Sequence, residues 1–351
     1  MSVLIYGAYG YSGELIARRA VKLGLPIVLA GRDAERTSAL ANGLGVPHRA
    51  FALDVPAEID RGLAGISVVL HCAGPFAATS AQMVSACLRT GVHYLDITGE
   101  WKVFEAAAAR SDEARERGIM LMPGVGLDVV PTDCLAAHLK ARLPGAQRLT
   151  LALFTNGGLS HGTATTMRQN LGEPGLIRRG GKLVPVSVAD VSRTFDMGFE
   201  AGRQTGIRMP WGDVSTAWYT TGIPDIEVFA CMPWQVRAGA KLMGFAGGLL
   251  RTRFVQDLVQ RRIEAAGAGP DPAHRARTLF WIYGEVADAE GKTAAARLRM
   301  PDGYEFTAAS AVVVANRVLG GEWNRGFQTP AAVFGPDFIL DFENVRREEL
   351  P

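Results

Sequence analysis

The sequence lacks the features that mark several large protein classes. Its 351 residues include only four cysteines, and none of them forms a CxxC pair. This argues against a disulfide framework and favours a reduced, cytoplasmic compartment. Residues 62–88 are the longest stretch without Asp, Glu, Lys or Arg. Polar residues and a Gly-Pro pair interrupt this stretch, so we do not expect it to span a membrane. The 37 basic and 35 acidic side chains nearly cancel, which excludes a global attraction to nucleic acid.

Signatures of metal chemistry and of nucleoside triphosphate binding are missing as well. There is no HExxH sequence and no GxxxxGK[ST] loop. Cys134 and His138 have a metal-like spacing, but the sequence offers no third or fourth ligand beside them. We therefore expect no metal site, and we expect these two side chains to pack on one helix face.

Short apolar segments alternate with helical patterns through the first third of the chain. We expect strands at 3–6, 27–30, 50–53, 67–71, 94–97 and 119–122, and helices at about 15–24, 33–41, 79–88 and 103–117. This alternation predicts an α/β fold with a doubly wound parallel sheet of the Rossmann type over residues 1–130. The pattern then changes, which predicts a second α/β or α+β domain over residues 131–300. A strand, a turn and an alanine-rich helix near residues 294–319 are expected to pack back onto the core, so residues 301–351 form a returning segment.

A glycine-rich sequence, GAYGYSG at residues 7–13, lies between the first expected strand and the first expected helix. In that position glycines allow the backbone to approach a pyrophosphate, while the N–H groups of the first helical turn face the anion. A strand-to-helix turn with no ligand is the alternative. The residues that we expect to contact a dinucleotide here are Gly7, Tyr9, Gly10, Tyr11, Ser12 and Gly13.

The end of the second expected strand determines the choice between the two nicotinamide cofactors. An acidic residue there would bind a free ribose hydroxyl, whereas an arginine favours a 2′-phosphate. Gly31 occupies the strand end and Arg32 follows it, so we predict NADP over NAD. The alternative is that Arg32 is a solvated surface residue and Asp33 caps the next helix.

Two further loops follow strand ends and are expected to flank the cofactor. Asp54 lies after the third strand, near the expected adenine site, although a turn or capping function fits it equally well. Ala73, Gly74 and Pro75 follow the fourth strand and are small enough for close approach to the nicotinamide.

Taken in order, these motifs resemble a known family. GAYGYSG, AGRD, HCAGPF, YLDITGE at 94–100 and GVGLDVVPTD at 124–133 resemble the saccharopine dehydrogenase-like oxidoreductases, which include the mycobacterial trans-acting enoyl reductases. Segments 161–165 and 326–331 resemble later motifs of that family. The resemblance implies NAD(P)-dependent oxidoreduction, a Rossmann domain and a second domain that holds the substrate. Ala8 stands where saccharopine dehydrogenases have a second glycine, which favours the enoyl reductase-like branch, and His161 stands where relatives often have glycine.

A reductase also needs a proton donor for the substrate atom that does not receive the hydride. Asp96 closes the fifth strand, Glu100 follows the next turn, and His161 lies in a polar Ser-His-Gly-Thr loop, so we predict these three as catalytic candidates. For each carboxylate, capping of backbone N–H groups is the alternative. Asp128 and Asp133 are expected to cap the helix that begins near Thr132.

Two segments of the second domain have an unusual composition. Residues 168–208 carry an excess of basic side chains, which would suit an anionic substrate such as a carboxylate or a phosphopantetheine thioester, or an ordinary solvated face. Residues 228–262 mix large apolar and basic side chains. We prefer a helix pair or a homodimer interface over peripheral contact with an anionic membrane.

These patterns predict a cytoplasmic NADP-dependent oxidoreductase that reduces a C=C or C=N bond of a small or acyl-type substrate, such as an acyl thioester. The alternative is a nucleotide-binding or membrane-associated interaction protein with little catalytic activity. No nucleic-acid partner is expected.

Overall fold

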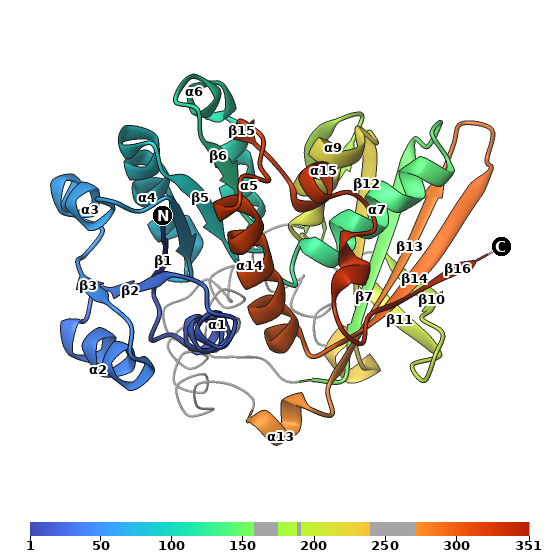
Figure 1. The fold of residues 1–351 in the computed structure, drawn as a ribbon. Coiled ribbons are helices and arrows are strands. Elements are labelled where there is room, and N and C mark those ends of the chain that lie inside the picture. Colours follow the sequence, from blue (N-terminus) through green and yellow to red (C-terminus); the bar gives the residue numbers. More distant parts are fainter. Residues whose placement is uncertain (158–174, 188–190, 239–270, 351) are drawn as a thin grey trace. The chain divides into compact units, whose positions relative to one another are not determined.

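The computed structural model describes residues 1–157, 175–187, 191–238 and 271–350, and the chain divides into two compact units (Figure 1). Unit 1 comprises Met1–Val130 and Tyr304–Phe334, and unit 2 comprises Pro131–Gly303 and Gly335–Pro351. The returning segment expected at 301–351 is therefore divided between the two units.

Unit 1 is built on a seven-stranded parallel sheet with the order β15-β6-β5-β4-β1-β2-β3. Its strands are β1 (Val3–Tyr6), β2 (Ile27–Gly31), β3 (His48–Ala50), β4 (Val68–His71), β5 (His93–Asp96), β6 (Met120–Met122) and β15 (Gly326–Phe327). The order reverses between β1 and β4, and doubly wound sheets bind their ligands at the carboxyl ends of strands beside such a reversal. The predicted Rossmann-type sheet is confirmed.

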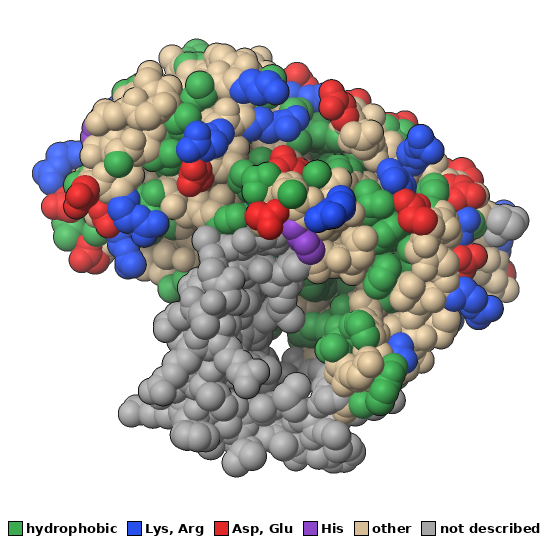
Figure 2. Space-filling view, turned by 90° about the horizontal axis from the view of Figure 1, so that it is seen from below, with side chains coloured by type: hydrophobic (Ala, Val, Ile, Leu, Met, Phe, Trp, Pro, Cys, Tyr) green, Lys and Arg blue, Asp and Glu red, His purple; other side chains and the backbone are tan. Residues whose placement is uncertain are grey.

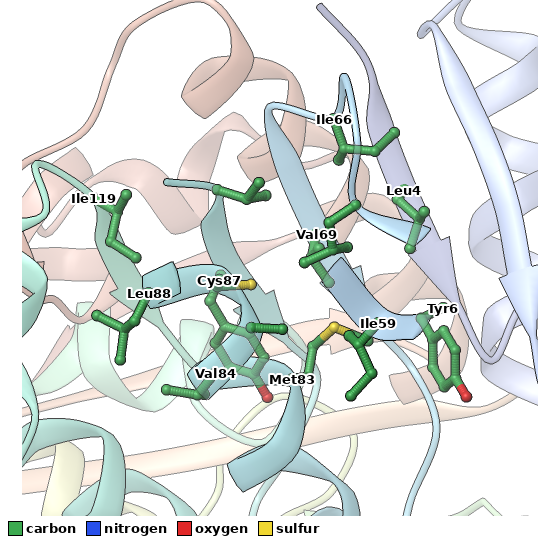
Figure 3. Packing of buried hydrophobic residues seen from close by; sticks show 14 of the residues in the cluster. Leu4, Tyr6, Ile59, Ile66, Val69, Met83, Val84, Cys87, Leu88 and Ile119 are labelled. Atoms are coloured by element: carbon green, nitrogen blue, oxygen red, sulfur yellow. The ribbon is translucent and has the colours of Figure 1, made fainter. Parts of the chain in front are cut away.

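Helices connect these strands and pack on the sheet (Figure 1). They are α1 (Tyr11–Lys22), α2 (Ala34–Leu44), α3 (Pro56–Gly62), α4 (Phe76–Thr90), α5 (Trp101–Ala108), α6 (Ser111–Glu116), α14 (Gly303–Leu319) and α15 (Pro330–Phe334). Alternate strand residues share a face of the sheet, so Leu4 and Val69 meet Met83 and Val84 of α4 in one buried cluster (Figure 3). Burying each such side chain stabilises the fold by about 1.5–3 kcal/mol.

Local sequence signals explain where α2 begins and ends. The Asp33 carboxylate accepts a hydrogen bond from the Arg36 backbone N–H at 3.0 Å, which caps the first turn. Gly45 ends the helix at a φ of 68°, in the left-handed region where a side chain would be strained.

Unit 2 is built on a nine-stranded mixed sheet, in which β12 and β7 form a parallel pair and the other pairs are antiparallel. Its strands are β7 (Arg148–Thr155), β8 (Gly175–Arg179), β9 (Lys182–Val186), β10 (Ser192–Asp196), β11 (Arg203–Arg208), β12 (Asp225–Cys231), β13 (Leu279–Ala287), β14 (Thr293–Pro301) and β16 (Arg346–Leu350). Its helices are α7 (Val130–Arg142), α9 (Asp213–Thr221), α13 (Pro272–Arg275) and the 3-10 helix η1 (Phe338–Asp341).

Side chains on both faces of this second sheet are buried. A Cβ on Gly284 of β13 would lie 2.8 Å from methyl carbons of Leu135 and Leu139, so α7 approaches β13 closely at this glycine. A separate cluster joins Phe195, Phe229 and Trp281 from three different strands. A sheet covered in this way is the mixed α/β architecture expected for the second domain.

Three local expectations differ from the structure. The helix expected at 103–117 is two helices, α5 and α6, and the sequence has no Gly or Pro at the break to signal it. The strand expected at 50–53 lies at His48–Ala50, and the short α3 that follows was not predicted because seven residues show too little periodicity. The helix pair expected from residue 228 is wrong at its start, because Val228 belongs to β12, and residues 239–262 lie outside the described residues.

Basic and acidic side chains are interspersed on the described part of the face in Figure 2, which fits the near-zero net charge. None of the helices in the described ranges combines the length and apolar content that crossing a bilayer requires. Those ranges also contain no group of three His, Cys, Asp or Glu side chains that could hold a metal ion.

Candidate functional site

The glycine turn joins β1 to α1 in unit 1, at the carboxyl edge of the sheet. Gly7 has a φ of 80°, and a Cβ there would lie 2.8 Å from the backbone nitrogen of Ala73. A Cβ on Gly13 would overlap the Gly7 carbonyl oxygen. Gly10 has more room, since the atom nearest to a Cβ added there would be 3.3 Å away, and as the N-cap it supplies no capping oxygen to the first-turn N–H groups. The first and third glycines are therefore required by the fold, whereas Gly10 leaves the helix N-terminus open to an anion.

The other predicted residues of this turn have distinct surroundings. The Tyr11 ring meets the Tyr304 ring edge to face at 5.0 Å, so α14 packs beside the start of α1. Ser12 is half-buried in the first turn of α1. The Tyr9 ring lies against Gly31, where a Cβ would be only 2.5 Å from the Tyr9 Cε1 atom, and the Arg36 guanidinium lies over that ring at 4.5 Å from its centroid.

The predicted residues Arg32 and Asp54 lie near enough to Tyr6 to interact with it electrostatically. The buried Tyr6 hydroxyl donates a hydrogen bond to the Phe51 carbonyl oxygen at 2.9 Å. The pKa of Tyr6 is raised to about 12, mainly by burial and also by electrostatic interactions with Tyr9 and Asp54, while Arg32 acts in the opposite direction. The ends of β1, β2 and the chain after β3 thus bring these predicted cofactor residues together.

A chain of hydrogen bonds holds the loop after β4, which contains Ala73, Gly74 and Pro75. The Thr79 hydroxyl donates to the Ala73 carbonyl oxygen at 2.7 Å, so its oxygen accepts from His71 Nε2 at 2.9 Å. Burial lowers the pKa of His71 to about 3, and the imidazole is therefore neutral at physiological pH. The Gly74–Pro75 peptide bond is cis.

Asp96, a predicted catalytic residue, links the ends of β5 and β6. It is 0% exposed, and its carboxylate accepts hydrogen bonds from the Tyr94 hydroxyl at 2.6 Å, the Thr98 N–H at 3.0 Å and the Gly124 N–H at 2.8 Å. Burial raises the pKa of Asp96 to about 6, and these three hydrogen bonds act in the opposite direction. Both oxygens are used within the protein, which favours the structural alternative for this residue.

Glu100, the second predicted catalytic carboxylate, caps α4. Its two oxygens accept hydrogen bonds from the backbone N–H groups of Phe76 at 2.9 Å and Ala77 at 2.8 Å. An acidic side chain in this position stabilises the N-terminus of a helix. Glu100 therefore orients the start of α4, directly after the loop that contains Pro75.

Asp128, which the sequence predicted as a helix cap, lies beside Glu100. Its carboxyl group packs on Gly99, where a Cβ would lie 2.8 Å from the Asp128 Oδ2 atom. Burial, followed by the Glu100 carboxylate, raises the pKa of Asp128 to about 6. The side chain is nevertheless partly exposed, unlike that of Asp96. Two neighbouring carboxyl groups in unlike environments are typical of acid–base chemistry.

The loop that contains Asp128 is braced by α14 from the C-terminal part of unit 1. The Leu127 N–H donates to the Thr307 hydroxyl at 3.0 Å, and the buried Ser310 hydroxyl donates to the Val125 carbonyl oxygen at 2.8 Å. Sequence patterns gave no sign of these two side chains, because about 180 residues separate them from the loop.

Two further sequence predictions concern His161 and the basic segment of the second domain. His161, with the GxSxG pentapeptide at 158–162 that surrounds it, lies outside the described residues. In the basic segment at 168–208, Arg178 donates to the Val214 carbonyl oxygen at 2.7 Å, while Arg193 and Arg208 pair with Glu285 and Glu227 at 2.8 and 3.1 Å. These internal partners favour an ordinary folded surface for that segment.

Comparison with known proteins agrees with the Rossmann-type fold of unit 1. Residues 3–122 match the family model described as the saccharopine dehydrogenase NADP binding domain. A provisionally named trans-acting enoyl reductase of Mycobacterium tuberculosis is 25% identical over 97% of this chain and 94% of its own. A saccharopine dehydrogenase-like oxidoreductase of Mus musculus is 25% identical over 50% of this chain and 47% of its own.

Among solved structures, the L-Glu-forming saccharopine dehydrogenase of Saccharomyces cerevisiae matches with a TM-score of 0.69 and 13% identity, over 100% of both chains. At that identity the match shows the fold alone. The resemblance inferred from the motifs is confirmed: residues 3–122 match the saccharopine dehydrogenase NADP binding domain, and the chain is similar to a trans-acting enoyl reductase over 97% of its length and to a saccharopine dehydrogenase-like oxidoreductase over half of it.

Proposed function

We propose that this chain is an NADP-dependent oxidoreductase that reduces a C=C or C=N bond of a small or acyl-type substrate. The observation that supports this most directly is the Glu100–Asp128 carboxyl pair, which lies at the same edge of the parallel sheet as the glycine turn. Ligands of doubly wound sheets bind outside this edge. The enoyl reductase names of relatives favour an acyl-type substrate.

The protein's part of the reaction is binding, orientation and proton delivery. Bound NADPH supplies a hydride to one atom of the substrate double bond. The other atom must receive a proton, from a group that is still partly protonated near neutral pH and reaches the substrate. We assign this donor function to Asp128, whose pKa of about 6 and partial exposure meet both conditions. Solvent then restores its proton.

The remaining candidates have other assignments in this proposal. Asp96 holds the ends of β5 and β6 with hydrogen bonds to both of its oxygens, so it has no free position for a substrate. Glu100 is a positioning residue, because its oxygens accept from the start of α4 while its charge raises the pKa of Asp128. His161 stays a prediction from the sequence.

Titration of the purified protein with NADPH and NADH, followed by turnover with enoyl thioesters and imines, tests the proposal. We expect selective NADPH binding and, with a substrate of one of these classes, transfer of deuterium from C4-deuterated NADPH to carbon in the product. Nucleotide binding without turnover of either class would favour the alternative of a nucleotide-binding interaction protein. Absence of binding would contradict the proposal entirely.

An Arg32→Ala variant is expected to weaken NADPH binding by about 10- to 100-fold and to leave NADH binding nearly unchanged, because only the 2′-phosphate needs a cationic partner. Dissociation constants for the two nucleotides, measured by calorimetry, check this. An equal effect on both nucleotides would show that Arg32 does not recognise the 2′-phosphate.

A Gly10→Val variant is expected to fold and to lose NADPH affinity by about 10- to 100-fold, which corresponds to an overpacking cost of about 1–3 kcal/mol. A Cβ on Gly10 would lie 3.3 Å from the Gly7 carbonyl oxygen, a tight contact but far milder than those at Gly7 and Gly13, so the added methyl groups should obstruct the pyrophosphate more than the fold. Gly43→Val is the control, since nothing lies within 4 Å of a Cβ at that position in α2. Wild-type affinity in Gly10→Val would contradict the assignment of the turn.

A further inference from the structure

The space where an NAD-binding protein places its acidic residue is filled by an aromatic ring in this chain. Gly31 ends β2, the position from which a carboxylate would bind a free ribose hydroxyl. Any side chain there would meet the Tyr9 ring, because a Cβ would lie 2.5 Å from Cε1 and 3.1 Å from Cδ1. The Tyr9 ring can occupy this space only because residue 31 is a glycine.

The Arg36 guanidinium lies over the Tyr9 ring. The guanidinium carbon lies 4.5 Å from the ring centroid, within the range of a cation–π contact. The Arg36 backbone is held as well, since its N–H donates to the Asp33 carboxylate at 3.0 Å in the first turn of α2. A long, otherwise mobile side chain is thus restrained at both its base and its tip.

Arg32 and Arg36 also carry positive charges that no carboxylate of the described residues pairs with. Within the described residues neither of them forms a salt bridge, whereas Arg18, Arg89 and Arg110 of the same unit each pair with a carboxylate. Both side chains are exposed beside the start of α2. Two unpaired guanidinium groups at one helix start favour a doubly charged partner such as a phosphate monoester.

We infer that Arg36, held on Tyr9, is a second arginine that recognises the 2′-phosphate of NADP, and that Tyr9 is its positioning residue. This inference rests on the proposed function and adds the residues that set its cofactor selectivity. Tyr9 acts twice, because it orients Arg36 and also occupies the space that an acidic, NAD-selecting side chain would need. Selectivity is then built into the packing of Gly31, Tyr9 and Arg36 rather than into Arg32 alone.

The test compares binding of NADPH with NADH and of adenosine 2′,5′-bisphosphate with 5′-AMP, by calorimetry. Arg36→Ala is expected to weaken both 2′-phosphorylated ligands by about 10- to 100-fold and the other two by less than about twofold. Arg36→Lys keeps the positive charge but cannot stack flat on the Tyr9 ring. We therefore expect it to lose less affinity for the 2′-phosphorylated ligands than Arg36→Ala does. Arg19→Ala, an exposed arginine near the other end of α1, is the matched control and should change nothing.

Tyr9 provides the second arm of the test. Tyr9→Phe keeps the ring face and is expected to retain selectivity, whereas Tyr9→Leu should lose part of the preference for 2′-phosphorylated ligands. Normal NADPH affinity in Arg36→Ala, or an equal loss for phosphorylated and unphosphorylated ligands, would overturn the inference while leaving the oxidoreductase proposal intact. Failure of the wild-type protein to bind any of the four ligands would overturn both.

Discussion

An Asp128→Asn variant is expected to bind NADPH with wild-type affinity and to turn over its substrate about 10²- to 10⁴-fold more slowly, the range typical for loss of a general acid. The amide keeps the size and polarity of the side chain on Gly99 but has no acidic proton. Loss of NADPH absorbance, in the presence of the substrate identified by the thioester and imine screen, measures the effect. Asp112→Asn, which changes an exposed carboxylate on α6, should leave the rate unchanged.

The pH dependence of the same reaction follows from the raised pKa of Asp128. A proton donor works only in its protonated form, so kcat/KM should fall as the pH rises through about 6 and approach a tenfold loss per pH unit above it. Asp128→Asn should remove this limb of the profile. A carbon-13 NMR titration of the Asp128 carboxyl group gives its pKa without any substrate. Normal turnover in the variant would exclude Asp128 as the donor.

An Asp96→Ala variant is expected to lower the free energy of unfolding by about 2–6 kcal/mol, measured by urea denaturation. It would leave the N–H groups of Thr98 and Gly124 buried without their acceptor, at about 1–3 kcal/mol each. Asp96→Asn retains one oxygen that can accept from both N–H groups, so its free energy of unfolding should fall less than that of Asp96→Ala. A variant that folds with wild-type stability but has no activity would contradict the structural assignment and support the catalytic one.

The raised pKa of Asp96 also predicts how stability depends on pH. Because its pKa is about 6 in the folded protein and 3.8 ordinarily, the folded state binds a proton more readily than the unfolded state. The free energy of unfolding should therefore decrease as the pH rises from about 4 to 6, by up to about 3 kcal/mol for this residue. Asp96→Asn should reduce that decrease, which urea denaturation at several pH values would measure.

Local patterns determined the Rossmann-type half of the fold and the position of its cofactor turn. Apolar strands covered on both faces, and the glycines between β1 and α1, are signals confined to a few neighbouring residues, so they are readable without the structure. The same holds for the Asp33 cap and the glycine at the end of β2. Breaks and short elements, such as the division between α5 and α6, were not readable because no residue there has a strong conformational preference.

The tertiary structure decided which polar side chains share an environment, because contacts between distant segments leave no local trace in the sequence. Asp96 and Glu100 look alike as strand-end carboxylates, yet one is enclosed by three donors and the other caps α4. Asp128 gained its raised pKa from burial beside Glu100, and its loop is held by Thr307 from the far end of the chain. Chemistry at such a site depends on distance and solvent access, and only the folded chain determines these.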